Sequence, residues 1–62
     1  MIITVHEGYD ESYIILTSGD KRFREKYEKY VHVMANNVYK ELEAISDWCN
    51  NELGEECLFE ID

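Results

Sequence analysis

The chain has 62 residues, which is room for one domain near the lower size limit for independent folding. Hydrophobic residues make up 45% of it and aromatic residues 13%, with three glycines and no proline, so it is not a disordered acidic tail. The formal net charge of −8 argues against direct binding of DNA or RNA, because that affinity comes largely from basic groups that neutralise phosphates. We therefore expect one folded domain over residues 1–62.

The first part of the chain predicts a β-hairpin. Residues 2–6 alternate between apolar and polar side chains, which is typical of a short strand. Residues 8–11 have turn chemistry, and residues 13–17 predict a second strand that is apolar on both faces, as in the interior of a sheet. The spacing suits an antiparallel pair. Asp20 or Ser18 can then cap a following helix.

Beyond the hairpin, apolar residues recur every three or four positions, which predicts a helix and its core-facing stripe. The stripe consists of Phe23, Tyr27, Tyr30, Met34, Val38, Leu42, Ile45, Cys49 and Leu53. Gly54 is a natural helix stop, and residues 56–62 predict a final strand. The predicted fold class is therefore α+β: a β-hairpin, a long helix, whole or broken, and a C-terminal strand.

The length of this helix creates a difficulty. A helix over residues 21–53 would be about 50 Å long, whereas strands of five or six residues span about 20 Å. Either the helix breaks, with the break expected at Asn36–Asn37, or something else covers its overhang. A third possibility is a strand over residues 29–34, where valine alternates with charged or polar neighbours, and a helix that begins near Asn37. We favour a mostly helical segment over residues 21–35.

The charges are distributed unevenly along the chain. Residues 1–20 carry four acidic and no basic side chains, residues 21–40 carry six basic against two acidic, and residues 41–62 carry eight acidic and no basic. The predicted helix therefore begins with bases and ends with acids, which reverses the arrangement that the helix dipole favours. A need for solubility can by itself explain an excess of acidic residues. A helix whose charges oppose its dipole, however, also indicates a place where function should be sought.

These charges lead us to expect a non-enzymatic protein-binding module, acting as an inhibitor, that engages a basic surface of a partner protein. Carboxylates would speed association and fix orientation, while aromatic side chains would supply most of the affinity. The candidate partner-binding residues are Tyr39, Glu41, Glu43, Asp47, Trp48, Glu52, Glu55 and Glu56. Carboxylates in a row can also occupy a groove meant for phosphates, so mimicry of nucleic acid is a specific form of this hypothesis. In general profile, the chain resembles the small inhibitors that phages and mobile elements make against host or defence proteins.

Two other functions compete with this one. The alternative is a homodimeric structural or adaptor protein in which residues 21–29 of one copy lie against residues 41–52 of the other. A metal-binding or catalytic protein comes third, because His6, His32 and the cysteines lack a ligand spacing and no nucleophile has a base nearby in sequence. We therefore expect no enzyme activity, no metal and no cofactor.

The remaining expectations concern the cysteines and the cellular compartment. We expect Cys49 and Cys57 to be reduced and buried, with a single disulfide as the alternative. The first residues lack the basic start and long apolar run of a signal peptide. The longest apolar run elsewhere, residues 13–16, is too short to cross a bilayer. These features predict a cytoplasmic protein that does not bind membranes.

Overall fold

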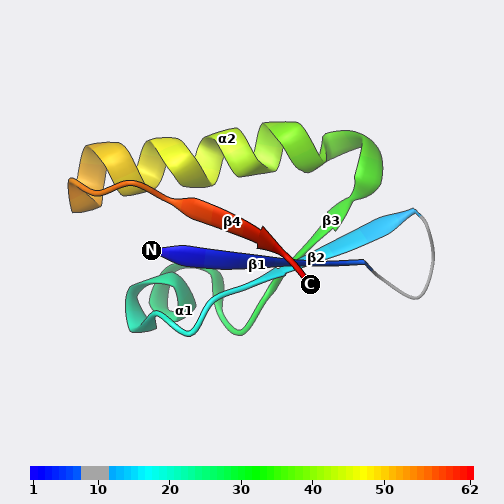
Figure 1. The fold of residues 1–62 in the computed structure, drawn as a ribbon, viewed down its shortest axis with the longest axis horizontal. Helices are drawn as coiled ribbons and strands as arrows, with labels where there is room; N and C mark the ends of the chain where they lie inside the picture. The colour runs from blue at the N-terminus through cyan, green and yellow to red at the C-terminus, as the bar shows by residue number, and fades with distance from the viewer. Residues whose placement is uncertain (8–11) are drawn as a thin grey trace.

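A computed structural model describes residues 1–7 and 12–62 of the chain. The described part forms a four-stranded mixed sheet and two α-helices, which confirms the predicted α+β class (Figure 1). The elements are β1 (Ile2–Glu7), β2 (Tyr13–Thr17), α1 (Lys21–Tyr27), β3 (Val31–Met34), a 3₁₀ turn (Ala35–Asn37), α2 (Val38–Trp48), a π turn (Cys49–Leu53) and β4 (Leu58–Ile61). The turn predicted at residues 8–11 lies outside the described residues.

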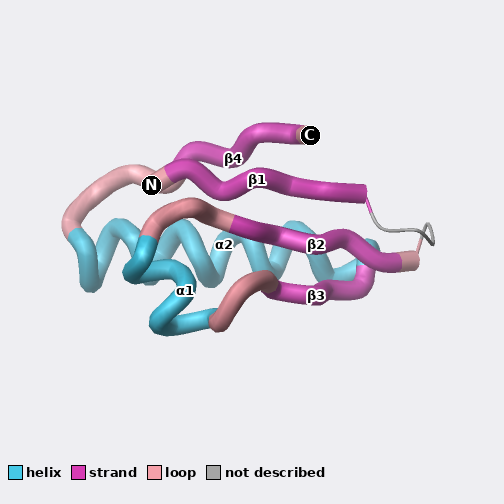
Figure 2. Tube along the Cα trace, turned by 90° about the horizontal axis from the view of Figure 1, so that it is seen from below, coloured by secondary structure: helices cyan, strands magenta, loops and turns pink. Residues whose placement is uncertain are grey.

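The strands lie in the order β3-β2-β1-β4, so that β3 and β4 form the two edges (Figure 2). The β1–β2 and β2–β3 pairs are antiparallel, which confirms the predicted hairpin, and β4 runs parallel to β1. Val5 lies opposite Leu16, and Ile3 lies opposite Phe59. This register places the apolar side chains of neighbouring strands on the same face, where α2 covers them.

The core lies between this face and the helices. Its buried members are Ile3, Leu16, Phe23, Val33, Ile45 and Cys49. They come from β1, β2, α1, β3, α2 and the π turn, so each of these elements is held by at least one buried side chain. Burial of a large apolar side chain contributes about 1.5–3 kcal/mol. A chain of this size therefore depends on a few residues for its stability.

The helix favoured over residues 21–35 is wrong in its second half, and the alternative with a strand there is confirmed. Helix α1 ends at Tyr27, and Glu28 follows with a φ of 67° while its N–H donates to the carbonyl of Arg24 at 2.9 Å. Val31 and Val33 then pair with β2. Tertiary strand pairing outweighs the helical spacing here, because β-branched residues fit a half-buried strand at least as well as a helix.

This strand changes the environment of three side chains. Tyr30 and Met34, which helical spacing placed in the core, are exposed, and His32 lies on a strand instead of a helix face. The strand also resolves the problem of helix length. The 3₁₀ turn, α2 and the π turn together cover residues 35–53, which at 1.5 Å per residue is about 28 Å, much shorter than one helix over residues 21–53.

Two predicted helix boundaries are confirmed. The Asp20 carboxylate accepts a hydrogen bond from the Arg22 backbone N–H at 2.8 Å and caps α1. Gly54 has a φ of 67°, and the following N–H of Glu55 donates to the Cys49 carbonyl at 3.1 Å. This is the left-handed conformation that glycine adopts readily at a helix end. Among the described residues, no helix has the length and apolarity needed to cross a bilayer.

Candidate protein-binding site

The predicted partner-binding residues lie on α2, on the π turn and in the loop that follows it. Glu41, Asp47, Trp48 and Glu52 line one flank of the helical segment that includes α2. Tyr39, with 85% of its side chain exposed, and the exposed Glu43 lie one turn apart. Glu55 and Glu56 follow the π turn at the end of this segment.

The flank of α2 contains a shallow groove of about 420 Å³ between α1 and the last turns of the helical segment. We call it the Trp48 groove; it is lined by Lys26, Tyr27, Ala44, Asp47, Trp48, Asn51 and Glu52. A second groove of about 360 Å³, lined by Val33, Asn37, Lys40, Glu41 and Ala44, shares Ala44 with it. The two grooves thus follow the same flank of α2, and they bring together four of the predicted side chains.

Aromatic rings connect the Trp48 groove to the core. The ring centroids of Tyr27 and Trp48 are 5.5 Å apart in an edge-to-face arrangement, and Tyr27 lies 5.1 Å from the buried Phe23. The Lys26 ammonium lies 5.6 Å from the centroids of both groove rings. This distance is within the range of a cation–π interaction. The groove therefore already holds a cation from its own chain.

The electrostatics of this flank are negative around the Tyr27 hydroxyl. Burial raises the pKa of Tyr27, and the negative charges of Glu41 and Glu52 raise it further. The hydroxyl consequently stays protonated at neutral pH and remains a hydrogen-bond donor. A positively charged side chain that entered the groove would find carboxylates beside the aromatic rings.

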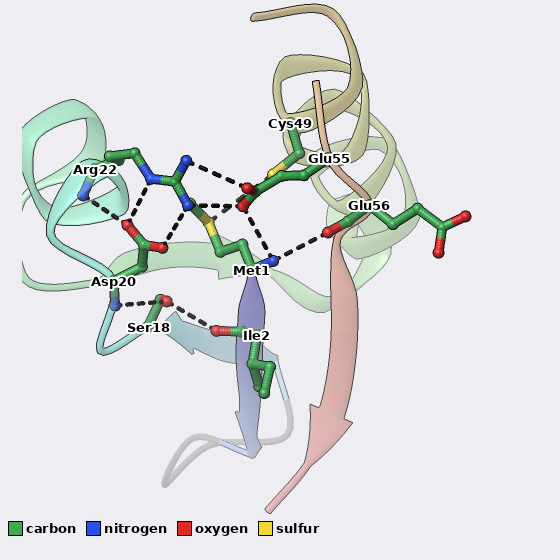
Figure 3. A network of polar contacts seen from close by, with 8 residues as sticks. All are labelled: Met1, Ile2, Ser18, Asp20, Arg22, Cys49, Glu55 and Glu56. Atoms are coloured by element: carbon green, nitrogen blue, oxygen red, sulfur yellow. Dashed lines mark hydrogen bonds and ion pairs between the residues drawn. The ribbon is translucent and has the colours of Figure 1, made fainter. Parts of the chain in front are cut away.

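Glu55 belongs to a separate polar network at the start of α1 (Figure 3). The Arg22 guanidinium lies 2.8 Å from the Asp20 carboxylate and 2.7 Å from that of Glu55. The amino group of Met1 lies 3.2 Å from the Glu55 carboxylate and donates to the Glu56 carbonyl at 3.0 Å. Glu55 is thus paired within the chain, whereas the side chain of Glu56 points away from the network.

The network predicts a defined loss of stability in acid. Hydrogen bonds from Arg22 lower the pKa of Asp20 to about 2 and also lower the pKa of Glu55. A carboxyl with a lowered folded-state pKa contributes fully above its unfolded-state pKa, and that contribution disappears as pH falls through the folded-state value. We expect Asp20→Asn and Glu55→Gln to lower the urea midpoint at pH 7, and most of the difference from wild type to be lost by pH 2. Glu43→Gln, which lies outside the network, is the control, and equal differences at both pH values would contradict the account.

A second polar cluster lies on the face of the sheet opposite α2. Nδ1 of His6 lies 2.9 Å from an Asp62 carboxylate oxygen, and Nε2 lies 2.8 Å from the Thr17 hydroxyl. Hydrolytic triads also combine a hydroxyl, an imidazole and a carboxylate in this order. His6, Thr17 and Asp62, however, line neither of the two grooves described above. The contacts connect the end of β4 to β1 and β2 across the sheet.

The cysteines are both free, and Cys49 is buried, as expected, whereas Cys57, which was also expected to be buried, is only half-buried. Burial, together with a hydrogen bond to Cys49, raises the pKa of the Cys57 thiol to about 12. This thiol is therefore protonated and weakly nucleophilic at neutral pH. In the part of the chain that the structure describes, no three His, Cys, Asp or Glu side chains are grouped so as to hold a metal ion.

Comparisons with known proteins give no relative for this fold or this groove. A scan against protein-family models finds no match, and searches of curated proteins and of solved structures find none either. Sequence reasoning identified Trp48 and the carboxylates but missed Lys26. Its position over the two rings depends on the packing of α1 against α2, for which the sequence has no local signal.

Proposed function

We propose that the protein is a non-enzymatic binding module that takes a lysine or arginine side chain of a partner protein into the Trp48 groove. The observation that carries this proposal is the position of Lys26, whose ammonium lies 5.6 Å from the centroids of Tyr27 and Trp48. Asp47 and Glu52 line the same groove. The partner's cation would take the place of Lys26, which is exposed and free to move aside.

The expected affinity follows from the kinds of contact involved. A cation–π contact contributes about 0.5–1 kcal/mol at an exposed site and about 2 kcal/mol when water is excluded. Each exposed carboxylate adds about 0.2–1 kcal/mol. One side chain therefore binds weakly, so the partner must present several basic residues along the flank of α2. Such a surface would associate quickly at low salt, because opposite net charges steer the encounter.

A protein that covers a basic surface can act as an inhibitor of whatever binds there, and a nucleic acid is one such ligand. Mimicry of nucleic acid is therefore a specific form of this proposal. The alternative of a helix-mediated homodimer remains a prediction. The apolar stripe over residues 23–53 that favoured it is interrupted by β3, whereas the opposite charges of residues 21–29 and 41–52 still favour it.

Trp48 is the single tryptophan of the chain, so its fluorescence reports on the groove without labelling. We expect saturable quenching or enhancement when the protein is titrated with an unstructured, glycine-spaced peptide of arginine and lysine. The double variant Asp47→Asn/Glu52→Gln should bind this peptide about 5-fold more weakly, since it loses two carboxylate contacts. The matched control, Glu7→Gln/Glu43→Gln, removes the same net charge at side chains that do not line the groove and should bind within about 2-fold of wild type.

If both double variants weakened binding of the basic peptide equally, the proposal would be wrong. The peptide would then respond only to the net charge of the protein and not to the groove. A peptide of glycine and glutamate should leave the Trp48 signal unchanged.

A further inference from the structure

We propose that the free edge of β4 is a second binding site, which takes an extended basic segment of a partner protein as a fifth strand of the sheet. The site is distinct from the Trp48 groove. Strand β4 forms one edge of the sheet, and α1, which supplies Lys26 and Tyr27 to the groove, connects to β3 at the other edge. Figure 2 shows β4 at its edge with no described element beyond it.

The backbone N–H and C=O groups of β4 that do not bond β1 are the main evidence for this site. The N–H of Leu58 donates to the Met1 carbonyl at 2.8 Å, and the N–H of Asp62 donates to the Val5 carbonyl at 3.0 Å. In a parallel ladder, alternate residues direct both backbone groups to the same neighbour. The N–H and C=O groups of Phe59 and Ile61 are therefore directed away from β1, toward the open edge. Such a row of groups is a template for a further strand.

Apolar side chains flank these backbone groups on both faces of the sheet. Leu58 is 57% exposed and Ile61 is 83% exposed. Because side chains alternate along a strand, Ile61 shares the face of Phe59 and the helices, while Leu58 lies on the opposite face with Glu60. An added strand would cover part of both side chains and satisfy the outward backbone groups at the same time.

The acidic side chains at this edge favour a basic segment as the added strand. Glu56 precedes β4, Glu60 lies within it and Asp62 follows it, and residues 41–62 contain no lysine or arginine. A complementary strand would place arginine or lysine beside Glu60 and an apolar residue beside Ile61. The partner segment is therefore expected to alternate basic and apolar residues.

The same charges disfavour a second copy of this chain as the occupant. Two β4 strands that paired about a two-fold axis would bring the carboxylates of Glu60 and its neighbours close to their symmetry mates. Like charges that lie opposite each other destabilise a strand pair. Each copy also carries a net charge of −8. Acidic residues on the edge thus protect the protein from self-pairing while they favour a basic segment.

The test uses a heptapeptide of alternating arginine and valine, added to the full chain that carries Asp47→Asn/Glu52→Gln to weaken the Trp48 groove. Amide hydrogen exchange, read by NMR, is the measurement. At saturating peptide we expect the exchange of Phe59 and Ile61 to slow at least about 10-fold, since both N–H groups gain a partner. A heptapeptide of alternating glutamate and valine should give no protection. If the basic peptide gives no protection, the proposal for β4 is wrong, whereas the proposed function of the Trp48 groove is not affected.

Two variants locate the site on β4. Ile61→Pro removes an outward N–H without removing a bond to β1, and proline is tolerated on edge strands; it should abolish protection at Phe59. Glu60→Lys should weaken binding of the arginine–valine peptide about 10-fold, while Glu43→Lys, the matched control on α2, should change it less than about 3-fold. Far-UV circular dichroism confirms that each variant is folded. If protection at Phe59 and Ile61 instead rose with protein concentration in the absence of peptide, a second copy would be the occupant and the proposal would be wrong.

Discussion

Replacement of Phe23 by alanine is expected to remove most of the stability of the fold. The side chain is 0% exposed and belongs to the core cluster with Ile45 and Cys49. Truncation of a buried phenylalanine costs about 3–5 kcal/mol. At about 0.05–0.15 kcal/mol per residue, a chain of this length has a total stability of only about 3–9 kcal/mol. The variant should therefore be partly or largely unfolded at 25 °C.

Urea unfolding, followed by Trp48 fluorescence and far-UV circular dichroism, measures this effect. Phe23→Ala should move the midpoint to a low urea concentration or abolish the folded baseline. The matched control is Tyr39→Ala, another aromatic truncation on a helical segment, at a side chain that is 85% exposed. Its free energy of unfolding should stay within about 0.5 kcal/mol of wild type. Equal midpoints for the two variants would show that the core is not organised around α1.

Charge reversal in the Trp48 groove is the second change with a large expected effect. In Asp47→Lys/Glu52→Lys, two attractive contacts with a basic peptide become repulsive. A loss of about 2 kcal/mol or more corresponds to a weakening of about 30-fold. Glu7→Lys/Glu43→Lys changes the net charge by the same amount at side chains that do not line the groove and should weaken binding much less.

The same reversal is expected to stabilise the helix slightly. Glu52 lies in the last turn of the helical segment, where a positive charge interacts favourably with the helix dipole and a negative charge does not. The urea midpoint should therefore stay equal or rise while binding is lost. Opposite changes in stability and affinity would separate a binding role of these residues from a structural one. A fall in both would contradict that role.

Local signals predicted much of this fold. The hairpin, the Asp20 cap, the Gly54 stop and the final strand all follow from residue types at fixed positions. Residues 31–34 were ambiguous because their apolar spacing fits both a strand and a helix. The choice depends on pairing with β2, where Ile14 lies opposite Val33, and this contact is not local in sequence.

The candidate site was harder to predict, for the same reason. The eight acids of residues 41–62 share one stretch of sequence without a base, but they lie on α2, on the π turn, in the loop after it, and on or just after β4. Glu55 pairs with Arg22, 33 residues away. Lys26 reaches Trp48 because α1 packs against α2. Sequence patterns indicate which residues carry charge, whereas long-range packing decides which of them share a surface.

The central claim is that the Trp48 groove accepts a cation, and the most direct test is the NMR signal of the Lys26 side chain. Its terminal methylene protons should be shifted upfield by the rings of Tyr27 and Trp48, since the ammonium lies 5.6 Å from each centroid. On titration with the glycine-spaced basic peptide, we expect these resonances to move to their random-coil positions, with the same midpoint as the Trp48 fluorescence change. If the peptide binds while the Lys26 resonances stay where they are, the cation enters elsewhere and the claim is wrong.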